Sequence, residues 1–494
     1  MTLSILIGGK AGQGSNILAH LVAGALVKKG YCVFYSRDYQ SVIRGGHNFN
    51  VVSFSDKEVY SNESKVDVIV ALDDKTLEIH RKELKKGGII LEGKEENMYF
   101  AGRLFKSLCL DFEILHEELK KLRNFDENLK HAQQGYSEQK ETCPVIQPGK
   151  IKGKLANGSS GIVDGAIEAG LDVYYAYPMT PATPILFEMA PRQKESNVLV
   201  LELESEIGVM NAALGSAITG AKTMIGTSGG GFDLMTEALS MAGMAEIPVV
   251  CYLASRPGPS TGVATYTGQG DLQLSRHCGH GEFNRAVLVP GDPDECSELA
   301  SQAFYFSQKF KIPTTILSDK HLAESFYTSI KTPRITHSEK STKLGRYNSY
   351  EHTSTGEASE DAKVIMQGVE RRLENKKKIK SEAERFEMFK IFGNKNSKNL
   401  IVSYGSPKGA ILDAIQDLDV KFLQVLYVEP FSDKIKSELE KAGKIILVEN
   451  SATGMLADVI REKTGVEIKE KILRYDGRPF LSDELANELR RRLK

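Results

Sequence analysis

The chain has 494 residues, which is too long for a single hydrophobic core, so its length predicts about three domains. Lys and Arg number 64 against 65 Asp and Glu, for a formal net charge of -1, and this balance provides no overall field for nucleic acid or a membrane surface. The start lacks a basic segment and no apolar stretch approaches the length of a membrane span, so we expect a soluble, cytoplasmic protein.

The six cysteines stand singly along the chain and form no Cys-x-x-Cys pair. A disulfide framework is not expected at this size and dispersion, and the spacing lacks the ligand pattern of a zinc or iron–sulfur site. Most of the cysteines should be small buried hydrophobic residues. The sequence therefore predicts no metal site in this chain.

Residues 1–112 predict a first α/β domain with a mostly parallel sheet, because apolar strand segments alternate with helical spacing. Its first strand and first helix are separated by the loop Gly8–Ser15, with the sequence GGKAGQGS. A glycine loop in this position commonly binds phosphate. Its glycine spacing is neither that of a P-loop nor that of a dinucleotide fingerprint, and a purely structural turn is the alternative.

The polar, charged segment over 113–147 predicts a linker, and a second α/β domain is expected over 148–330. The composition turns hydrophilic again over 331–397, which predicts a charged bridge with a helix around Arg371–Arg385. A third α/β domain is expected over 398–494.

Residues Tyr177–Pro184, with the sequence YPMTPATP, follow an apolar strand segment and predict a stiff turn. Prolines remove backbone donors and fix φ, so the hydroxyls of Thr180 and Thr183 can be held in one preset orientation suited to an anion. A proline-rich strand exit with no chemical role is the alternative interpretation.

Further downstream, three acids alternate at Glu202, Glu204 and Glu206. This pattern fits either an acid positioned for proton exchange or the polar face of a strand. The turn Thr227–Gly231, with the sequence TSGGG, allows close backbone approach to a neighbour, or simply starts a helix.

Arg256 precedes Pro257-Gly258-Pro259, which fixes the backbone and directs the guanidinium into whatever the loop faces. A guanidinium matches a carboxylate with two parallel hydrogen bonds, so a carboxylate ligand is one interpretation. A surface ion pair is the other.

In this order and spacing, the motifs resemble those of 2-oxoacid:ferredoxin oxidoreductases, whose YPITPSTP signature differs from this sequence only at Met179 and Ala182. The downstream motifs resemble the thiamine-diphosphate pyrimidine domain of the family's α subunit. They stand at Glu202–Gly208, Thr227–Gly231 and Arg256–Gly262.

The resemblance extends over nearly the whole chain. Gly8–Ser15 resembles the GxGGQG loop of the family's γ domain, with Ala11 in place of one glycine, and Arg44-Gly45-Gly46-His47 matches that domain's RGG motif. The chain is thus similar to a fused γ-α subunit of the 2-oxoglutarate:ferredoxin oxidoreductase type. This implies three α/β domains: a γ domain, a thiamine-diphosphate pyrimidine-binding domain and a transketolase C-terminal-like domain. Three further motifs are expected to be structural; they are Gly345–Gly356, Glu449–Leu456 and Tyr475–Phe480.

The resemblance implies a role for each matching residue. Glu206 would be the catalytic carboxylate at N1′ of thiamine diphosphate, which promotes removal of the C2 proton, with Glu204 as the alternative. Thr180 and Arg256 would bind the 2-oxoacid. The cofactor would also be contacted by Thr227, Ser228 and Gly229.

In relatives the γ domain is associated with coenzyme A, so Gly12, Gly14 and Arg44 are the residues expected to bind this co-substrate. No Gly-Asp-Gly motif for a Mg²⁺-bound diphosphate occurs, and the nearest strings include Gly270-Asp271-Leu272. The resemblance therefore implies a separate β subunit that supplies Mg²⁺ and the iron–sulfur cluster, with ferredoxin as electron acceptor.

The activity implied is coenzyme A-dependent oxidative decarboxylation of a 2-oxoacid, with 2-oxoglutarate as first choice. A member specific for pyruvate or branched-chain 2-oxoacids, and a non-catalytic paralogue, are the alternatives. A self-sufficient thiamine enzyme would need the diphosphate motif that the sequence lacks.

Overall fold

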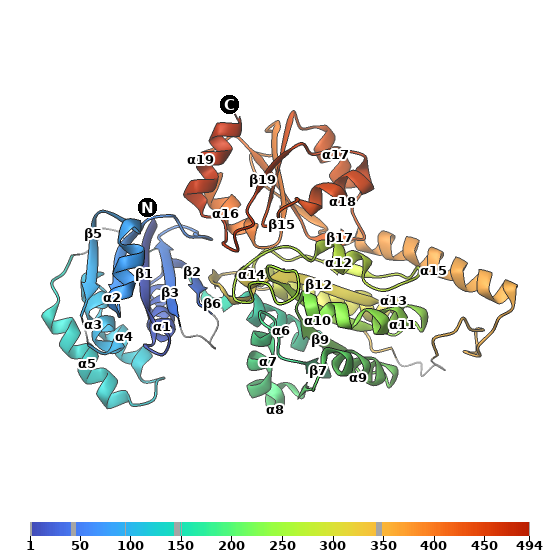
Figure 1. Cartoon of the computed structure of the whole chain (residues 1–494), viewed down its shortest axis with the longest axis horizontal. Helices are drawn as coiled ribbons and strands as arrows, with labels where there is room; N and C mark the ends of the chain where they lie inside the picture. Colours follow the sequence, from blue (N-terminus) through green and yellow to red (C-terminus); the bar gives the residue numbers. More distant parts are fainter. Residues whose placement is uncertain are drawn as a thin grey trace.

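The structure is a computed structural model. It describes residues 2–40, 46–93, 95–142, 149, 151–341 and 348–493. These residues form three β-sheets of seven, seven and five strands, each accompanied by helices. In Figure 1 the first body lies at the left in blue, the second at the lower right in green and yellow, and the third at the top in orange and red. The predicted fold class of three α/β units is confirmed.

The first sheet is mixed, with the strand order β5-β4-β1-β3-β2-β13-β6. In it β4 runs parallel to β1 and β5, but β3 runs antiparallel to both β1 and β2. The connection from Asp38 to His47 is too short for the crossover that a parallel pair needs, so the prediction of a mostly parallel sheet is wrong. The strands are β1 (Thr2–Lys10), β2 (Cys32–Asp38), β3 (His47–Ser55), β4 (Val66–Ala71), β5 (Leu84–Glu92), β6 (Lys154–Asn157) and β13 (Phe326–Ser329).

The segment expected as a linker over 113–147 is mostly helical where it is described. It contains most of α4 (Phe112–Leu119) and all of α5 (Phe125–Glu138), and both helices pack against α3 (Asn97–Ser107). Two further helices of this body are α1 (Ser15–Lys28) and α2 (Asp74–His80).

Small residues explain why this polar segment packs instead of linking. A Cβ at Gly102 of α3 would lie 2.0 Å from the carbonyl oxygen of Ala132, and a Cβ at Gly135 of α5 would lie 2.0 Å from that of Tyr99. Leu115 joins the first hydrophobic core beside them. The high share of polar residues on the outer faces hid this packing in the sequence.

The second sheet has the order β17-β11-β12-β10-β9-β7-β8 and is parallel except at the β11–β17 pair. Its strands are nearly all buried on both faces, as expected for a parallel sheet with helices on each side. The strands are β7 (Val173–Ala176), β8 (Leu199–Glu202), β9 (Thr223–Thr227), β10 (Val249–Ser255), β11 (Ala286–Leu288), β12 (Pro313–Asp319) and β17 (Tyr427–Glu429). The helices are α6 (Gly158–Glu168), α7 (Thr183–Met189), α8 (Gln193–Ser196), α9 (Glu206–Ile218), α10 (Gly229–Leu234), α11 (Thr236–Met244), α12 (Leu272–His277), α13 (Pro293–Phe310) and α14 (Lys320–Glu324).

The third sheet has the order β14-β16-β15-β18-β19, with β14 as its antiparallel edge strand. It begins inside the segment expected as a bridge, because Phe389–Gly393 pairs with β16. The strands are β14 (Phe389–Gly393), β15 (Asn399–Tyr404), β16 (Lys421–Val425), β18 (Lys444–Glu449) and β19 (Glu470–Leu473). The helices are α16 (Pro407–Ala414), α17 (Lys434–Glu440), α18 (Met455–Thr464) and α19 (Ser482–Leu493).

The expected charged helix of the bridge is α15 (Ala362–Ala383), which begins earlier than predicted and projects to the right of the second body in Figure 1. No helix in the described part of the chain is long and apolar enough to cross a membrane.

A buried charged network fixes the third body on the second. Glu295, at the start of α13, accepts hydrogen bonds from Lys408 (2.5 Å), Lys390 (3.0 Å) and Gln424 (2.6 Å). Burial disfavours the ionised carboxylate, but Lys408 and Lys390 outweigh it and hold the pKa of Glu295 below its ordinary value. The third body also contributes one strand, β17, to the second sheet, where it pairs with β11.

Four cysteines are free and buried, as predicted for small hydrophobic residues; these are Cys32, Cys251, Cys278 and Cys296. Cys109 differs, because it is disulfide-bonded. The dispersed spacing of the cysteines gave no sign of this bond.

Candidate active site

Four neighbouring strands of the second sheet end at one edge. The order β10-β9-β7-β8 places the carboxyl ends of these parallel strands side by side. The chain leaves β7 towards β8 on one side and β9 towards β10 on the other, so a topological switch point lies between β7 and β9. Ligands of open α/β sheets bind in the crevice at such a point. The residues that follow these strands are Thr180, Glu206, Ser228 and Arg256.

Thr180 and Arg256, which are separated in sequence, meet at this edge. A guanidinium NH group of Arg256 donates a hydrogen bond to the backbone carbonyl of Thr180 at 2.8 Å. Arg256 makes no ion pair within the described ranges, so the alternative of a surface ion pair receives no support. Burial lowers the pKa of Arg256, and Asp271 opposes this effect. A half-buried cation in this state favours an anionic ligand.

Glu206 is buried at 6 % exposure and is the first residue of α9, whereas Glu202 and Glu204 are exposed. The hydroxyl of Ser205 caps the helix by accepting a hydrogen bond from the amide of Gly208 at 3.2 Å. This cap fixes the start of α9 and so the place of the neighbouring carboxylate. Polar-face alternation therefore describes the first two acids but not the third.

The side chain of Glu206 contacts the turn between β9 and α10. A Cβ at Gly231 would lie 2.7 Å from Cγ of Glu206 and 2.2 Å from Oγ1 of Thr227, so only glycine fits between them. The hydroxyl of Ser228 is buried and has no hydrogen-bond partner in the described structure. Buried polar atoms normally have partners, and Ser228 therefore marks a place where a ligand can bind.

Asp271 completes the edge, and the sequence interpretation missed it. Its carboxylate accepts a hydrogen bond from the Ser255 hydroxyl at 2.6 Å and lies against Gly229, where a Cβ would be 2.7 Å from Oδ1. Burial raises the pKa of Asp271, while Ser255 and Arg256 oppose the rise. In the sequence Asp271 stands out only within an incomplete Gly-Asp-Gly match. Its position directly before α12 was the available signal, because helix starts often carry acids.

The predicted coenzyme A residues lie elsewhere, on the loop between β1 and α1. Gly12 and Gly14 have φ of 93° and 80°, which other residues rarely adopt. Asn97 contacts Gly14, since a Cβ there would lie 2.1 Å from its side-chain nitrogen. Arg44 lies outside the described residues.

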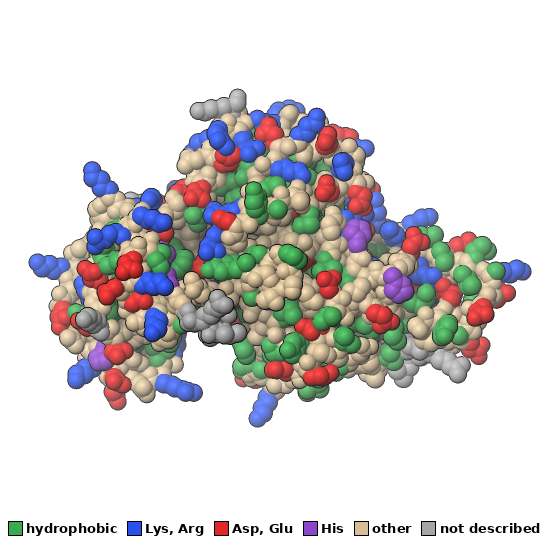
Figure 2. Space-filling model, in the orientation of Figure 1, with side chains coloured by type: hydrophobic (Ala, Val, Ile, Leu, Met, Phe, Trp, Pro, Cys, Tyr) green, Lys and Arg blue, Asp and Glu red, His purple; other side chains and the backbone are tan. Residues whose placement is uncertain are grey.

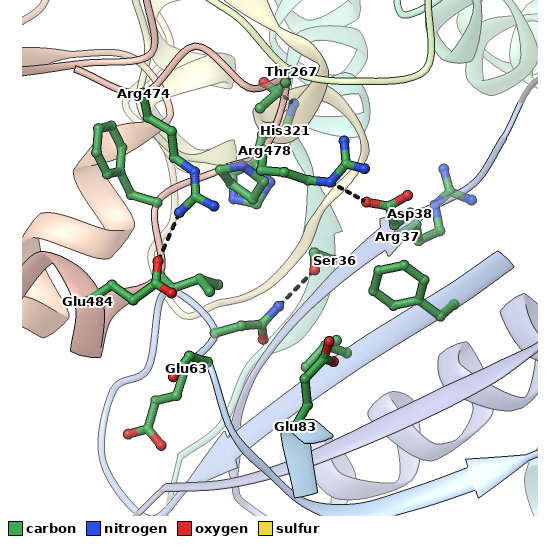
Figure 3. A pocket seen from close by; sticks show the side chains of 18 of the residues that line it. Ser36, Arg37, Asp38, Glu63, Glu83, Thr267, His321, Arg474, Arg478 and Glu484 are labelled. Carbon is green, nitrogen blue, oxygen red and sulfur yellow. Dashed lines mark hydrogen bonds and ion pairs between the residues drawn. The ribbon is translucent and has the colours of Figure 1, made fainter. Parts of the chain in front are cut away.

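A cavity of about 540 Å³ opens where the three bodies meet (Figure 3). Arg474 pairs with Glu484 at 3.1 Å, and Arg478 lies 3.7 Å from the carboxylate of Asp38 and stacks on Tyr266 at 3.9 Å. The sequence could not reveal this cavity, because its walls come from segments far apart in the chain. Other lining residues are Ser36, Arg37, Glu63, Glu83, Thr267, Lys320 and His321.

Two protein-family models match the chain. Residues 4–99 match the model described as pyruvate ferredoxin/flavodoxin oxidoreductase, and residues 164–390 match the thiamine diphosphate-binding model of pyruvate flavodoxin/ferredoxin oxidoreductases. A 2-oxoacid:ferredoxin oxidoreductase subunit alpha from Sulfolobus sp is 28% identical, and the alignment covers 99% of this chain and 96% of that protein. The chain belongs to the 2-oxoacid:ferredoxin oxidoreductase family. Its place there is that of an alpha subunit of an oxidoreductase.

Other members of the family are similar over parts or all of the chain. The 2-oxoglutarate synthase subunit KorA from Archaeoglobus fulgidus is 36% identical over 35% of this chain and 51% of that protein. A solved 2-oxoglutarate:ferredoxin oxidoreductase from Magnetococcus marinus, with 2-oxoglutarate, coenzyme A and succinyl-CoA bound, superimposes with a TM-score of 0.89 over 100% of both chains. At 23% identity, the similarity to this solved structure shows the fold alone.

The sheet edge fits the pyrimidine half of thiamine diphosphate. It offers a buried carboxylate at Glu206, a buried hydroxyl at Ser228 that lacks a partner among the described residues, and a turn at Gly231 that a Cβ would fill. A carboxylate suits a ring nitrogen that carries a proton, and hydroxyl and backbone groups suit an aminopyrimidine edge. This set of groups agrees with the thiamine diphosphate-binding model that covers the same residues.

Proposed function

We propose that this subunit, together with a β subunit, catalyses the coenzyme A-dependent oxidative decarboxylation of a 2-oxoacid with ferredoxin as electron acceptor. The observation that carries the proposal is the single sheet edge that holds both the buried Glu206, after β8, and a half-buried Arg256, after β10, that is hydrogen-bonded to Thr180. An acid for the cofactor and a cation for the substrate are the two groups that this chemistry needs from the protein.

When bound, thiamine diphosphate supplies the carbon nucleophile that attacks the 2-oxoacid. Glu206 holds a proton at N1′ of the aminopyrimidine, and its burial keeps water away from this bond. Arg256 and Thr180 bind the substrate carboxylate, with Arg256 donating from its guanidinium fork. The cofactor is contacted by Thr227, Ser228 and Gly229.

Exposed apolar side chains around the site support docking of the β subunit there. Ile207 and Leu234 are 53% and 54% exposed, and Tyr177 and Val263 are exposed nearby on the loops after β7 and β10. Figure 2 shows hydrophobic side chains gathered over the lower part of the second body. In this proposal the β subunit covers the edge and supplies the Mg²⁺-diphosphate half-site and the iron–sulfur cluster that reduces ferredoxin.

We keep 2-oxoglutarate as the first choice of substrate. Its support is the partial match to 2-oxoglutarate synthase subunits and the 2-oxoglutarate bound in the similar solved structure. Pyruvate and branched-chain 2-oxoacids carry the same carboxylate that Arg256 would bind.

Two places could bind coenzyme A, the co-substrate in the same solved structure. One is the predicted set of Gly12 and Gly14, in the loop between β1 and α1, with Arg44 of the RGG motif. The other is the cavity at the junction of the three bodies, favoured by its size and by Arg37, Arg474 and Arg478 in its walls. Phosphate groups bind guanidinium and helix-start amides alike, so the two places are separated only by experiment.

The test is reconstitution of this chain with a β subunit of the family. The assembled enzyme should reduce ferredoxin or a viologen dye when given a 2-oxoacid and coenzyme A, and this chain alone should not. Three substrates are compared: 2-oxoglutarate, pyruvate and a branched-chain 2-oxoacid. No 2-oxoacid-dependent reduction by the assembled enzyme would contradict the proposed activity, and a higher kcat/KM for another substrate would correct the substrate.

A further inference from the structure

The loop over 256–271 carries two groups of the proposed site and is anchored both within the second body, where the Thr267 hydroxyl donates to Asp319, and from the third body. It begins with Arg256 after β10 and ends with Asp271 before α12. The loop contains glycines at 258, 262, 268 and 270, which make it costly to hold in one conformation. Arg256 and Asp271 are hydrogen-bonded to Thr180 and Ser255 at the two ends, and the glycine-containing stretch between them needs contacts of its own.

Gln269 provides these contacts. Its backbone amide donates to the carbonyl of Asn450 at 2.7 Å, and its side-chain oxygen accepts from the amide of Asn450 at 2.8 Å. Its side-chain nitrogen donates to the carbonyl of Tyr404 at 3.0 Å, and its own carbonyl accepts from the Tyr404 hydroxyl at 3.3 Å. With 3 % exposure, Gln269 is thus held by four hydrogen bonds to the third body.

The third sheet presents rigid partners to Gln269. Tyr404 ends β15 and Asn450 directly follows β18, which pairs with β15, so both lie at one edge of the third sheet. Glu449 fixes this edge by accepting hydrogen bonds from the amides of Met455 and Leu456 at 2.8 and 2.9 Å, at the start of α18. Gln269 thus links the loop after β10 to the carboxyl edge of the third sheet.

We propose that Gln269 is a positioning residue through which the third body sets the geometry of Arg256 and Asp271. The inference rests on the proposed role of Arg256 in carboxylate binding. It gives a definite role to the Glu449-Asn450 motif, which the sequence suggested was merely structural, because the backbone of Asn450 accepts a hydrogen bond from the backbone amide of Gln269 and donates one to its side-chain oxygen. A misplaced arginine loses alignment with both carboxylate oxygens, so small displacements of the loop weaken substrate binding.

A first experiment measures loop order without any activity. Tyr404→Phe removes the hydroxyl that reaches Gln269 and keeps the packed ring. Hydrogen–deuterium exchange in the purified chain should rise about 3- to 10-fold for peptides covering 257–271, as expected when one such bond is lost. Tyr427→Phe is the matched control, because Tyr427 is equally buried and donates to Gln302 instead. Equal exchange in the two variants would overturn the proposal.

A second experiment uses the assembled enzyme. Gln269→Met should lower kcat/KM for every 2-oxoacid about 10- to 50-fold, mainly through KM. Combined with Arg256→Lys it should cost little more than Arg256→Lys alone, since both changes disturb one contact with the substrate. Gln424→Met, another buried glutamine bonded to Glu295, should add independently to Arg256→Lys.

The outcomes separate the two proposals. Full additivity of Gln269→Met with Arg256→Lys overturns the positioning role even if the enzyme is active. Raised loop exchange in Tyr404→Phe, together with no effect of Arg256→Lys on any substrate, supports anchoring of the loop and overturns the proposed carboxylate site.

Discussion

Two glycine-containing turns of this protein connect a strand to a helix, yet they have different surroundings. In the loop between β1 and α1, the amide of Lys10 donates to the side chain of Gln13 at 2.6 Å, and Gln13 donates to the carbonyl of Leu72 at 3.0 Å. In the turn between β9 and α10, the buried hydroxyl of Ser228 has no partner among the residues described. The side chain of Gln13 in the first loop is thus hydrogen-bonded at both its oxygen and its nitrogen, whereas the Ser228 hydroxyl at the second turn is not paired in the described structure.

Sheet topology explains this difference. At the second turn, the parallel strands β8, β7, β9 and β10 all end at one edge and bring four motifs together. At the first, the parallel β4 ends at the same edge as β1, but β3 on the other side of β1 is antiparallel and its carboxyl end points to the opposite edge. The second turn differs because the strands on both sides of its glycine motif, β7 and β10, end at the same edge as β9.

The largest expected effect is at the second turn. Glu206→Gln keeps the shape but removes the carboxylate from N1′, so exchange of the C2 proton of thiamine diphosphate in the assembled enzyme should fall by about 10²- to 10⁴-fold. Glu204→Gln is the matched control, because this neighbouring acid is exposed. Exchange near the wild-type rate in Glu206→Gln would move the role to another residue.

Next in size is the substrate contact. Arg256→Lys keeps the charge but loses the bidentate fork, so kcat/KM should fall about 10- to 150-fold for 2-oxoglutarate, pyruvate and a branched-chain 2-oxoacid alike. Thr180→Val removes one hydroxyl at nearly constant shape and should cost less, because the carbonyl bonded to Arg256 remains. A loss for only one of the three substrates would show that Arg256 contacts the substrate side chain and not the shared carboxylate.

The sequence predicted the parts of the site that stand in continuous motifs. Thr180, Glu206 and Arg256 were predicted because their motifs resemble those of a known family, and their roles stay predictions. Asp271 and Gln269 were not found, because their roles depend on contacts with Ser255 and with the third sheet that only folding creates.

The same reason explains which parts of the fold could be predicted from the sequence and which could not. Several strands of the second sheet, such as β10 and β11, are continuous apolar runs, which the sequence shows directly. The antiparallel place of β3, the addition of β6 and β13 to the first sheet, and the packing of α5 through Gly135 all depend on partners distant in sequence.

A smaller effect is expected on KM, and the ligand whose KM changes should differ between the two turns. Gly229→Ala places a methyl group against the Asp271 carboxylate and should raise KM for the 2-oxoacid or the thiamine cofactor about 5- to 10-fold. Gly12→Ala meets no neighbour, but its φ of 93° costs about 1 kcal/mol in stability. If the first loop binds coenzyme A, Gly12→Ala should raise only the KM for coenzyme A. An unchanged KM for coenzyme A would favour the cavity at the junction of the three bodies, where Arg478→Gln is the next variant.

The smallest expected effect is on the pH dependence of stability, which should have opposite sign at the first loop and at the second turn. Burial, followed by the nearby His80, lowers the pKa of His47 from its ordinary 6.5, and the two imidazoles share a hydrogen bond of 2.9 Å at the base of the first loop. The folded state therefore binds this proton less readily than the unfolded chain, so the contribution of His47 to stability is lost as pH falls below 6.5. At the second turn the pKa of Asp271 is raised by burial, so its contribution to stability is present at low pH and is lost as pH rises above 3.8.

Hydrogen exchange at about pH 7.5 and about pH 5.5, corrected for the intrinsic rate, should show loosening of β1 and β3 at the lower pH but none of β9 and β10. His47→Gln keeps a side chain able to bond His80 without titrating, and should abolish this loosening; if the loosening persists in that variant, another group of the first body carries the pH dependence.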